Sequence, residues 1–249
     1  MKQKVVLIVQ ARVGSTRLPG KSMMDLAGEP LVGRVLERVL RCQSVDDIVL
    51  AIPRTDENDA LAELAGQYGV NLYRGSEDDL VDRYYQAAKT FNATIVGRLP
   101  ADNPVPESCE IDRIIEYHMQ SNNAFSSNLS EVYGSGYPDG VGAEMINFTA
   151  LEAVWRGCRD PELREHVHLN FFNYIEQKQV DERFSVGTIE CPEAFRRPEI
   201  ILDVNTQEQY EFIKQIYEYF YNTNPYFHIT DILDWYDQIY LKNINNLSE

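Results

Sequence analysis

Short apolar runs alternate with segments of helical period along much of the chain. Residues 5–9 form a continuous aliphatic run without polar alternation, which is typical of a strand covered on both faces of a parallel sheet. Shorter runs predict further strands at residues 47–52, 94–99 and 200–203. Apolar residues that recur every three or four positions predict helices at residues 31–40, 60–68, 80–91 and 111–119.

Strands that alternate with helices indicate a doubly wound α/β sheet. The 249 residues are enough for one large α/β domain with a substantial core, and no repeat or linker divides them. We therefore expect a single Rossmann-like domain over residues 1–249, with a mostly parallel central sheet flanked by helices. Ligands of such a sheet bind beyond the carboxyl ends of its strands.

The pattern changes between residues 123 and 142, where Asn, Ser, Gly and Pro are frequent. This composition predicts a loop or short hairpin inserted over the site or at an interface. Helical period returns at residues 149–156 and 162–177, and a strand is expected at 184–189. Residues 206–241 are predicted to form an aromatic-rich helical tail whose side chains serve packing.

Composition narrows the classes of partner. The formal net charge of -16 at pH 7 argues against nucleic acid, because phosphate backbones are bound by clustered Lys and Arg. No apolar stretch reaches the roughly 18 residues of a membrane span, and the first apolar run is too short for a signal peptide. The four cysteines are far apart and lack metal-site spacing. The sequence therefore predicts a cytoplasmic protein with reduced thiols, and neither nucleic acid nor membrane as a partner.

A cationic loop with two glycines follows the first predicted strand. Residues 10–22 carry Arg12, Arg17 and Lys21. Free backbone N–H groups and fixed cations at a strand exit are what a triphosphate requires. The ending Gly-Lys-Ser resembles a P-loop, but that motif needs a glycine where this chain has Ser15. The alternative is a solvated basic turn, and as loop cations Arg17 and Lys21 are expected to contribute little to stability.

Two aspartates lie at the ends of predicted strands. Asp102 stands between Pro100 and Pro104, which restrict the turn that directs its side chain. Asp203 ends the apolar run at its own strand. Two such carboxylates facing a triphosphate loop match the hard oxygen ligands that Mg²⁺ takes together with substrate phosphates. For Asp203 the alternative is a helix cap, because Thr206 is placed to start the next helix.

Five segments of the chain resemble one known family. They are Ala11 through Lys21, Arg74 through Tyr85, Arg98 through Pro104, Arg164 through Val167, and Leu202 through Thr206. They are similar to the signature sequences of cytidylyltransferases that make CMP-activated acidic sugars, and most similar to the branch called spore coat polysaccharide biosynthesis protein F. This resemblance covers most of the chain.

The resemblance implies a nucleotidyltransferase of GT-A-like fold. An oxygen of a sugar-like or otherwise small anionic acceptor would attack the α-phosphorus of CTP and release pyrophosphate, with Mg²⁺ held by Asp102 and Asp203. It also implies a homodimer and a role in cell-surface polysaccharide or glycan biosynthesis. The implied nucleotide-binding residues are Ala11, Arg12, Gly14, Ser15, Arg17, Lys21, Asp78, Arg83 and Asp102. The implied acceptor-binding residues are Asp139, Glu144, Arg164 and His166, and the catalytic residues are Arg12, Arg17, Lys21 and His166.

Several of these assignments have alternatives. His166 could bind the acceptor or assist proton transfer, or be an ordinary helical histidine. Asp78, Asp79 and Arg83 also suit the start of a helix. Ala143 departs from the Asp-Val-Glu of relatives, which leaves the acceptor open. Two rival functions are a glycosyltransferase of similar topology, although no Asp-x-Asp occurs in the chain, and a catalytically silent nucleotide-binding subunit.

Overall fold

The computed structural model describes residues 3–15 and 17–242 of the chain. Thr16, which belongs to the predicted triphosphate loop, lies outside the described residues. In chain order the strands and helices are β1 (Val5–Gln10), β2 (Asp25–Leu26), β3 (Glu29–Pro30), α1 (Leu31–Val39), β4 (Asp47–Pro53), α2 (Asp59–Tyr68), β5 (Asn71–Gly75), α3 (Leu80–Thr90), β6 (Ile95–Pro100), α4 (Ser108–Gln120), β7 (Phe125–Ser127), β8 (Glu144–Asn147), α5 (Phe148–Gly157), α6 (Pro161–Glu165), β9 (Phe172–Asn173), β10 (Lys178–Gln179), β11 (Val186–Gly187), α7 (Gln207–Phe220) and α8 (Ile229–Trp235).

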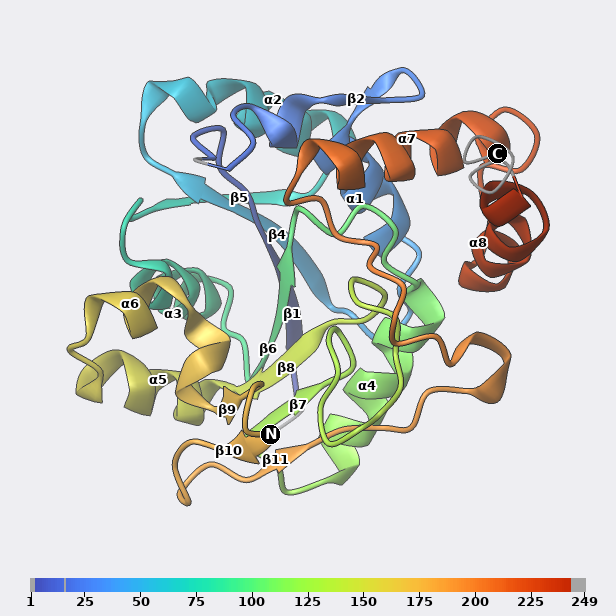
Figure 1. The fold of residues 1–249 in the computed structure, drawn as a ribbon. Coiled ribbons are helices and arrows are strands. Elements are labelled where there is room, and N and C mark those ends of the chain that lie inside the picture. The colour runs from blue at the N-terminus through green and yellow to red at the C-terminus, as the bar shows by residue number, and fades with distance from the viewer. Residues whose placement is uncertain (1–2, 16, 243–249) are drawn as a thin grey trace.

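Within the described residues, seven strands form the central sheet in the order β11-β7-β8-β6-β1-β4-β5 (Figure 1). The central strand β1 pairs in parallel with β4 and β6, and β4 with β5 and β7 with β11 are also parallel. Strand β8 runs antiparallel to β6 and β7. The predicted α/β fold with a mostly parallel sheet is therefore confirmed.

Helices cover both faces of this sheet. Val5, Leu7 and Val9 of β1 pack into the cluster that contains the buried side chains of α1, α4, α7 and α8. Val6 and Ile8 point to the other face, where α3 and α5 lie. Figure 1 shows these two groups of helices on opposite sides of the strands. Because both faces are covered, β1 is aliphatic throughout its first five residues, as the sequence pattern predicted.

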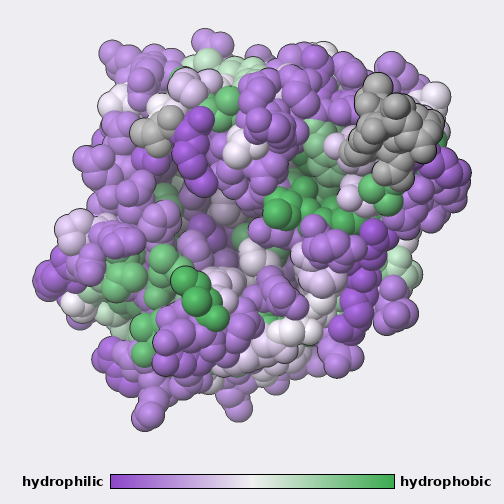
Figure 2. Space-filling model, viewed as in Figure 1, coloured by the Kyte–Doolittle hydropathy of each residue, from purple (hydrophilic) through white to green (hydrophobic). Residues whose placement is uncertain are grey.

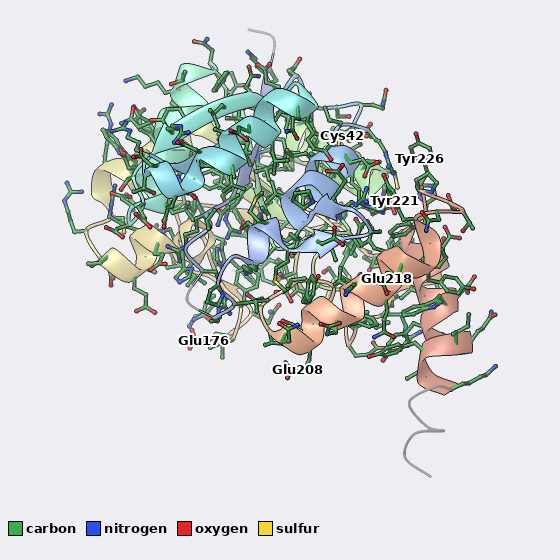
Figure 3. The ribbon with its side chains drawn as sticks, turned by 90° about the horizontal axis from the view of Figure 1, so that it is seen from above. Cys42, Glu176, Glu208, Glu218, Tyr221 and Tyr226 are labelled. Carbon is green, nitrogen blue, oxygen red and sulfur yellow. The ribbon has the colours of Figure 1, made fainter. Side chains whose placement is uncertain are left out.

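The C-terminal segment is helical and packs against α1. It forms two helices, α7 and α8, instead of one continuous helix. The Arg34 guanidinium lies 3.5 Å from the ring centroid of Tyr221, and that of Arg41 lies 4.3 Å from Tyr226 (Figure 3). Such cation–π contacts fix the aromatic rings on the helix they cover. The prediction that the aromatic residues of this segment serve packing is confirmed for the buried Tyr210, Tyr217 and Trp235, whereas Tyr219 and Tyr226 are exposed.

The predicted helix at residues 162–177 is wrong beyond its first residues. Helix α6 ends at Glu165, a 3₁₀ turn follows, and β9 and β10 then form an antiparallel hairpin. The Asn170 side-chain amide donates to the carbonyl oxygens of Leu163 and Val167 at 2.8 and 3.2 Å. Because these bonds satisfy the end of the helix, the chain can turn although its pattern is helical.

Three further differences concern strands. Residues 200–203 make an isolated parallel bridge, Asp139 to Ile201, and no strand. The predicted loop at 123–142 begins with β7, and the edge strand β5 was not predicted. The strand expected at 184–189 is confirmed in part, as β11. Within the described residues, the four cysteines are free and no helix combines the length and apolar character needed to cross a membrane.

Candidate functional site

A cavity of about 390 Å³, the strand-end cavity, opens beyond the carboxyl ends of β1 and β6. Figure 2 shows a hollow in the middle of this face with polar residues around it. Ligands of doubly wound sheets bind at this edge. The predicted site residues that line the cavity are Ala11, Arg12, Ser15, Arg17, Lys21, Arg83, Asp102, His166 and Asp203.

The loop after β1 folds back on itself and aims Lys21 inward. The Ser22 hydroxyl donates to the Arg12 carbonyl oxygen at 2.8 Å, and Gly20 adopts a left-handed conformation with φ 72°. Lys21 Nζ donates to Asp102 Oδ2 at 2.7 Å and to the Val204 carbonyl oxygen at 2.9 Å. Lys21 is only 9% exposed. The assumption that this lysine is a surface cation is therefore wrong, and we expect a contribution to stability because Lys21 links two segments.

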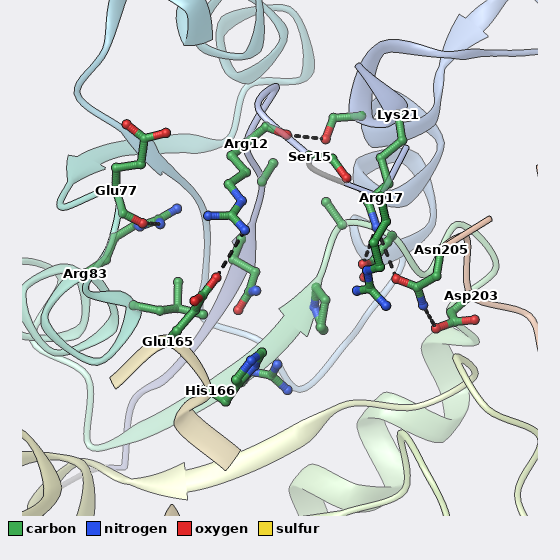
Figure 4. A pocket seen from close by; sticks show the side chains of 18 of the residues that line it. Arg12, Ser15, Arg17, Lys21, Glu77, Arg83, Glu165, His166, Asp203 and Asn205 are labelled. Atoms are coloured by element: carbon green, nitrogen blue, oxygen red, sulfur yellow. Dashed lines mark hydrogen bonds and ion pairs between the residues drawn. The ribbon is translucent and has the colours of Figure 1, made fainter. Parts of the chain in front are cut away.

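Arg12 and Arg17 complete the cationic side of the cavity. Arg12 Nη2 lies 3.2 Å from Oε1 of Glu165, which stands at the end of α6 on the other side of the cavity (Figure 4). Arg17 is exposed and also lines the cavity. The loop thus presents one buried and two accessible cations to the same space.

Arg83, on α3, forms another wall of the cavity. Asp79 caps this helix, since its Oδ1 accepts from the Asp82 amide at 2.8 Å. The Arg83 side chain is buried, its Nη2 donates to the Glu77 carbonyl oxygen at 3.1 Å, and burial lowers its pKa to about 10 (Figure 4). Its Nε has no partner among the described residues. A buried guanidinium with a free donor favours an acceptor from a ligand.

Three aspartates meet because their backbones are bonded to one another. The Val204 amide donates to the Asp102 carbonyl oxygen at 2.7 Å, which places Asp102 beside Asp203. The Leu202 amide donates to the Asp139 carbonyl oxygen at 3.0 Å, which brings in the third carboxylate. The close approach needs Gly140, because a Cβ there would lie 3.2 Å from a Leu202 backbone atom at φ 93°.

The electrostatics of this group fit a divalent cation. Burial, Asp139 and Asp102 together raise the pKa of Asp203 to about 7. Asn205 and Gln209 donate amide hydrogens to the two Asp203 oxygens and so orient the carboxylate. No group of three acidic, His or Cys side chains within the described residues forms a complete metal site. Two carboxylates from the protein, with the remaining ligands from phosphates and water, are the usual arrangement for Mg²⁺.

Asp203 is not a helix cap. The cap of α7 is Thr206, whose Oγ1 accepts from the Gln209 amide at 3.3 Å, and Gln209 completes a capping box. The alternative role considered for Asp203 is therefore excluded.

A second cavity of about 160 Å³, the side cavity, joins the first. Asp139 and Glu144, predicted for the acceptor, line it. Glu144 is buried and accepts from Arg98 Nη1 at 2.6 Å and from the Tyr174 hydroxyl at 2.9 Å. The residues that border both cavities are Arg98, Pro100, Asp102, His168 and Asp203. The two cavities therefore form one continuous site with the aspartates at their junction.

One histidine lies at this junction, and a second lies close to it. His166, at the end of α6, is exposed and lines the strand-end cavity. His168 borders both cavities, and its ring lies 6.0 Å from that of His166 and 5.4 Å from that of Tyr174. Burial, with smaller effects from Arg98 and His166, holds the pKa of His168 well below its ordinary value. Burial therefore favours the neutral form of the His168 imidazole.

Three predicted residues do not line either cavity: Gly14, Asp78 and Arg164. Arg164 Nε donates to Asp79 Oδ2 at 2.7 Å, and Nη1 donates to the Cys158 carbonyl oxygen at 3.0 Å. This arginine is thus engaged in holding α6 against the start of α3.

The buried polar atoms without a partner gather around the strand-end cavity, and the sequence analysis missed three of the residues that carry them: Gln10, Arg98 and His168. Within the described residues, four of the five buried side-chain atoms without a hydrogen-bond partner are Gln10 Oε1, Arg83 Nε, Arg98 Nε and His168 Nδ1, and all four side chains line the strand-end cavity. Buried polar atoms in folded proteins are nearly always paired, so a cluster of exceptions indicates a ligand site. A charged residue inside the apolar run 94–99 was the available signal for Arg98.

Cations on a strand-exit loop face strand-end carboxylates across one cavity, at the edge where doubly wound α/β proteins bind their ligands. The chain belongs to the cytidylyltransferase family, whose model matches residues 6–232. The family and the nucleotidyltransferase activity predicted from the sequence are confirmed. The glycosyltransferase and the silent subunit are set aside as alternatives.

Relatives and solved structures agree with this membership. The chain is 32% identical to an uncharacterized protein of Methanocaldococcus jannaschii, over 98% of this chain and 95% of the relative. It is 29% identical to spore coat polysaccharide biosynthesis protein SpsF of Bacillus subtilis, over 86% of each. A cytidylyltransferase structure from Leptospira borgpetersenii superposes with a TM-score of 0.84 at 28% identity, over 95% of each chain. CMP:2-keto-3-deoxy-manno-octonic acid synthetase complexed with CTP, at 16% identity, shares the fold with a TM-score of 0.65 over 87% of this chain and 99% of that one.

Proposed function

We propose that this cytidylyltransferase transfers CMP from CTP to a sugar-like acceptor and releases pyrophosphate. The observation that carries the proposal is the cluster of unpartnered buried polar atoms around a cavity that also holds the loop cations and strand-end carboxylates. A role in cell-surface polysaccharide or glycan biosynthesis is supported by the similarity to SpsF.

The strand-end cavity takes the nucleotide. Arg12, Arg17 and Lys21 face the triphosphate, and the backbone of Ala11 and Ser15 approaches it from the same loop. Gln10 and Arg83 offer one acceptor and one donor for polar atoms of the base or ribose. When phosphate binds to Arg12, the ion pair between Arg12 and Glu165 breaks. This ion pair is partly exposed and therefore weak.

Asp102 and Asp203 would hold a divalent cation, and Mg²⁺ is the ion that we propose. When bound, it neutralises charge on the phosphates and the leaving pyrophosphate. Lys21 keeps Asp102 in place through their 2.7 Å contact, while Asn205 and Gln209 orient Asp203.

The acceptor enters from the side cavity, so its attacking oxygen faces the α-phosphorus at the junction. Holding both reactants in one continuous site supplies much of the rate gain, because the reaction becomes effectively unimolecular. His166 is exposed in the strand-end cavity, and its ring lies 6.0 Å from that of His168 at the junction, so we assign the acceptor proton to the His166 imidazole. Arg164 and Asp78 receive no role in the chemistry.

Pyrophosphate release from CTP, Mg²⁺ and a panel of sugars tests the transfer, and calorimetry with the four nucleoside triphosphates tests the base. We expect CTP to bind at least about tenfold tighter than UTP, ATP or GTP, which is about 1.4 kcal/mol. Tighter binding of another triphosphate would refute the assignment of CTP.

A further inference from the structure

Helix α6 depends on contacts with other elements for its position. It has five residues, Pro161–Glu165, and none of them is buried. Isolated helices of this length are unstable in water, so contacts outside the helix must fix it. Its last residue, Glu165, and the following His166 nevertheless line the strand-end cavity (Figure 4). The position of these two side chains therefore depends on what anchors α6 to the rest of the fold.

Arg164 anchors α6. Its Nε donates to Asp79 Oδ2 at 2.7 Å, and its Nη2 lies 2.7 Å from the same oxygen. Its Nη1 donates to the carbonyl oxygens of Trp155 and Cys158 at 3.1 and 3.0 Å. Those carbonyls belong to the end of α5, where backbone acceptors lack helical partners. One guanidinium thus ties α6 to both α3 and α5.

Asp79 connects this anchor to another wall of the cavity. Its Oδ1 accepts from the Asp82 amide at 2.8 Å and caps α3, while its Oδ2 accepts from Arg164. Helix α3 carries Arg83, which lines the same cavity as His166. Figure 1 shows α3 and α6 side by side. A single carboxylate therefore couples two helices that each supply a wall of the cavity.

The ion pair itself lies outside the substrate space. Neither Arg164 nor Asp79 lines the strand-end cavity or the side cavity. Their side chains are 17% and 31% exposed, and their charges match one to one. The pair therefore needs no ligand, and it supports residues that face the substrate.

We propose that Arg164 and Asp79 are positioning residues of the transferase reaction, because their ion pair sets where the His166 imidazole stands in the cavity. This assignment rests on the proposed function, in which His166 takes the acceptor proton. A catalytic group must stand within hydrogen-bond reach of the proton that it accepts, so a small shift of α6 costs turnover. CTP affinity depends less on the pair, because the cations of the loop after β1 face the nucleotide from another segment.

Kinetics of the full-length enzyme with CTP, Mg²⁺ and the fastest sugar of the panel test the proposal. Arg164→Ala should lower kcat by roughly tenfold or more, with the Kd for CTP within about threefold of wild type. Asp79→Asn should also lower kcat, since asparagine keeps the cap of α3 and removes the charge that Arg164 faces. The matched control is Arg156→Ala, which removes a 68% exposed arginine and its ion pair with Glu152 from the end of α5. Unchanged kcat in Arg164→Ala, or an equal loss in the control, would overturn the proposal.

A double-mutant cycle identifies the group through which Arg164 acts. In a His166→Ala background, Arg164→Ala should change kcat by less than about threefold, because the group that it positions is absent. A further loss of about tenfold would show that Arg164 acts elsewhere and would overturn the proposal. A fall in CTP affinity as large as the fall in kcat would also overturn it, because such a fall indicates damage to the whole cavity.

Spectra of the histidine rings test the positioning without turnover. The chain has four histidines, so each ring can be followed by NMR in the full-length protein. Arg164→Ala should shift the His166 signal and leave in place that of His228, which lies at the start of α8. An unmoved His166 signal would overturn the proposal.

Failure of the proposed function gives different results. Unchanged kcat in His166→Ala would refute the proton role of His166 and this inference with it, while transfer from CTP would stand. A wild-type enzyme that binds CTP and reacts with no sugar would refute only the sugar-like acceptor, and the histidine spectra would then decide the inference.

Discussion

Arg17 and Lys21 belong to one loop but have different surroundings, so their alanine variants should differ. Arg17→Ala should weaken CTP binding by about tenfold or more and leave stability within about 0.5 kcal/mol of wild type, because its side chain is exposed. Lys21→Ala should lower both the affinity for CTP and the free energy of unfolding, because the substitution leaves Asp102 and the Val204 carbonyl oxygen without their partner. Calorimetry and urea unfolding measure the two effects. Identical behaviour of the two variants would contradict the difference in burial.

The proposed metal role of Asp102 and Asp203 can be tested with asparagine variants, which keep the shape of the side chain. Replacing either by Asn removes the charge that a hard cation requires, so turnover should fall by roughly a hundredfold or more. Excess Mn²⁺ should restore part of the activity, because it binds such sites more tightly than Mg²⁺. Pyrophosphate release against metal concentration is the measurement. Near-normal turnover of Asp203→Asn at low Mg²⁺ would show that Asp203 is not a metal ligand. A capping role would not explain a loss of turnover, because Thr206 already caps α7.

At the scale of the elements, a buried histidine connects α4 to β7 and β8 by hydrogen bonds. His118, 2% exposed, receives a hydrogen bond at Nδ1 from the Ser126 hydroxyl at 2.9 Å and donates from Nε2 to Asn147 Oδ1 at 3.1 Å. Burial lowers the pKa of His118 to about 4, against 6.5 for an exposed histidine. The unfolded chain therefore binds a proton that the folded protein does not between these pH values.

This difference gives a pH dependence with a defined sign. The contribution of His118 to the free energy of unfolding is present above pH 6.5 and is lost as the pH falls toward 4, by about 2 kcal/mol at pH 5. Urea unfolding of wild type and His118→Gln at pH 7.5 and pH 5 measures it. The variant should be less stable at pH 7.5 and should show a smaller loss on acidification. Equal losses in both proteins would place the pH sensitivity elsewhere.

The elements that the sequence predicted best are those whose pattern and surroundings agree. Strand β1 is covered on both faces, so an uninterrupted aliphatic run is its natural sequence. The predictions for residues 162–177 and 200–203 were wrong because single contacts decided the structure of these segments. Asn170 ends a helix through side-chain bonds to the nearby Leu163 and Val167 carbonyl oxygens, and Ile201 finds one bridge partner in the distant Asp139. Neither contact can be predicted from the pattern of apolar and polar residues along the chain.

The site was predictable to the extent that its residues follow strands or resemble a motif. Arg12, Lys21, Asp102 and Asp203 were expected together and line one cavity. Arg98 was missed as a site residue, although an arginine inside a buried strand requires a partner. His168 reaches the site on the 3₁₀ turn after α6, and Tyr174 on the β9–β10 hairpin. The sequence pattern predicted neither element, so the role of these residues needed the structure.

At the scale of the whole molecule, the strand-end cavity differs in charge from the rest of the chain. The chain carries a net charge of -16, yet five cations line this cavity beside four carboxylates: Arg12, Arg17, Lys21, Arg83 and Arg98. Such a local concentration draws a polyphosphate to one place on a surface that otherwise repels it. The same acidic surface works against assembly, so any contact between copies requires an apolar area.

The hairpin β9–β10 offers such an area, and we predict that the homodimer expected for this family forms there. Ile175 is 95% exposed, and Val180 and Tyr133, close to the hairpin, are 51% and 49% exposed. Burying such exposed apolar side chains in an interface would stabilise the assembly, because it removes apolar surface from water. Ile175→Asp should shift sedimentation from dimer to monomer with unchanged thermal unfolding of the monomer, whereas Leu72→Asp, at the β5 edge, should not. A wild-type monomer at micromolar concentration, or a dimer unaffected by Ile175→Asp, would refute this interface.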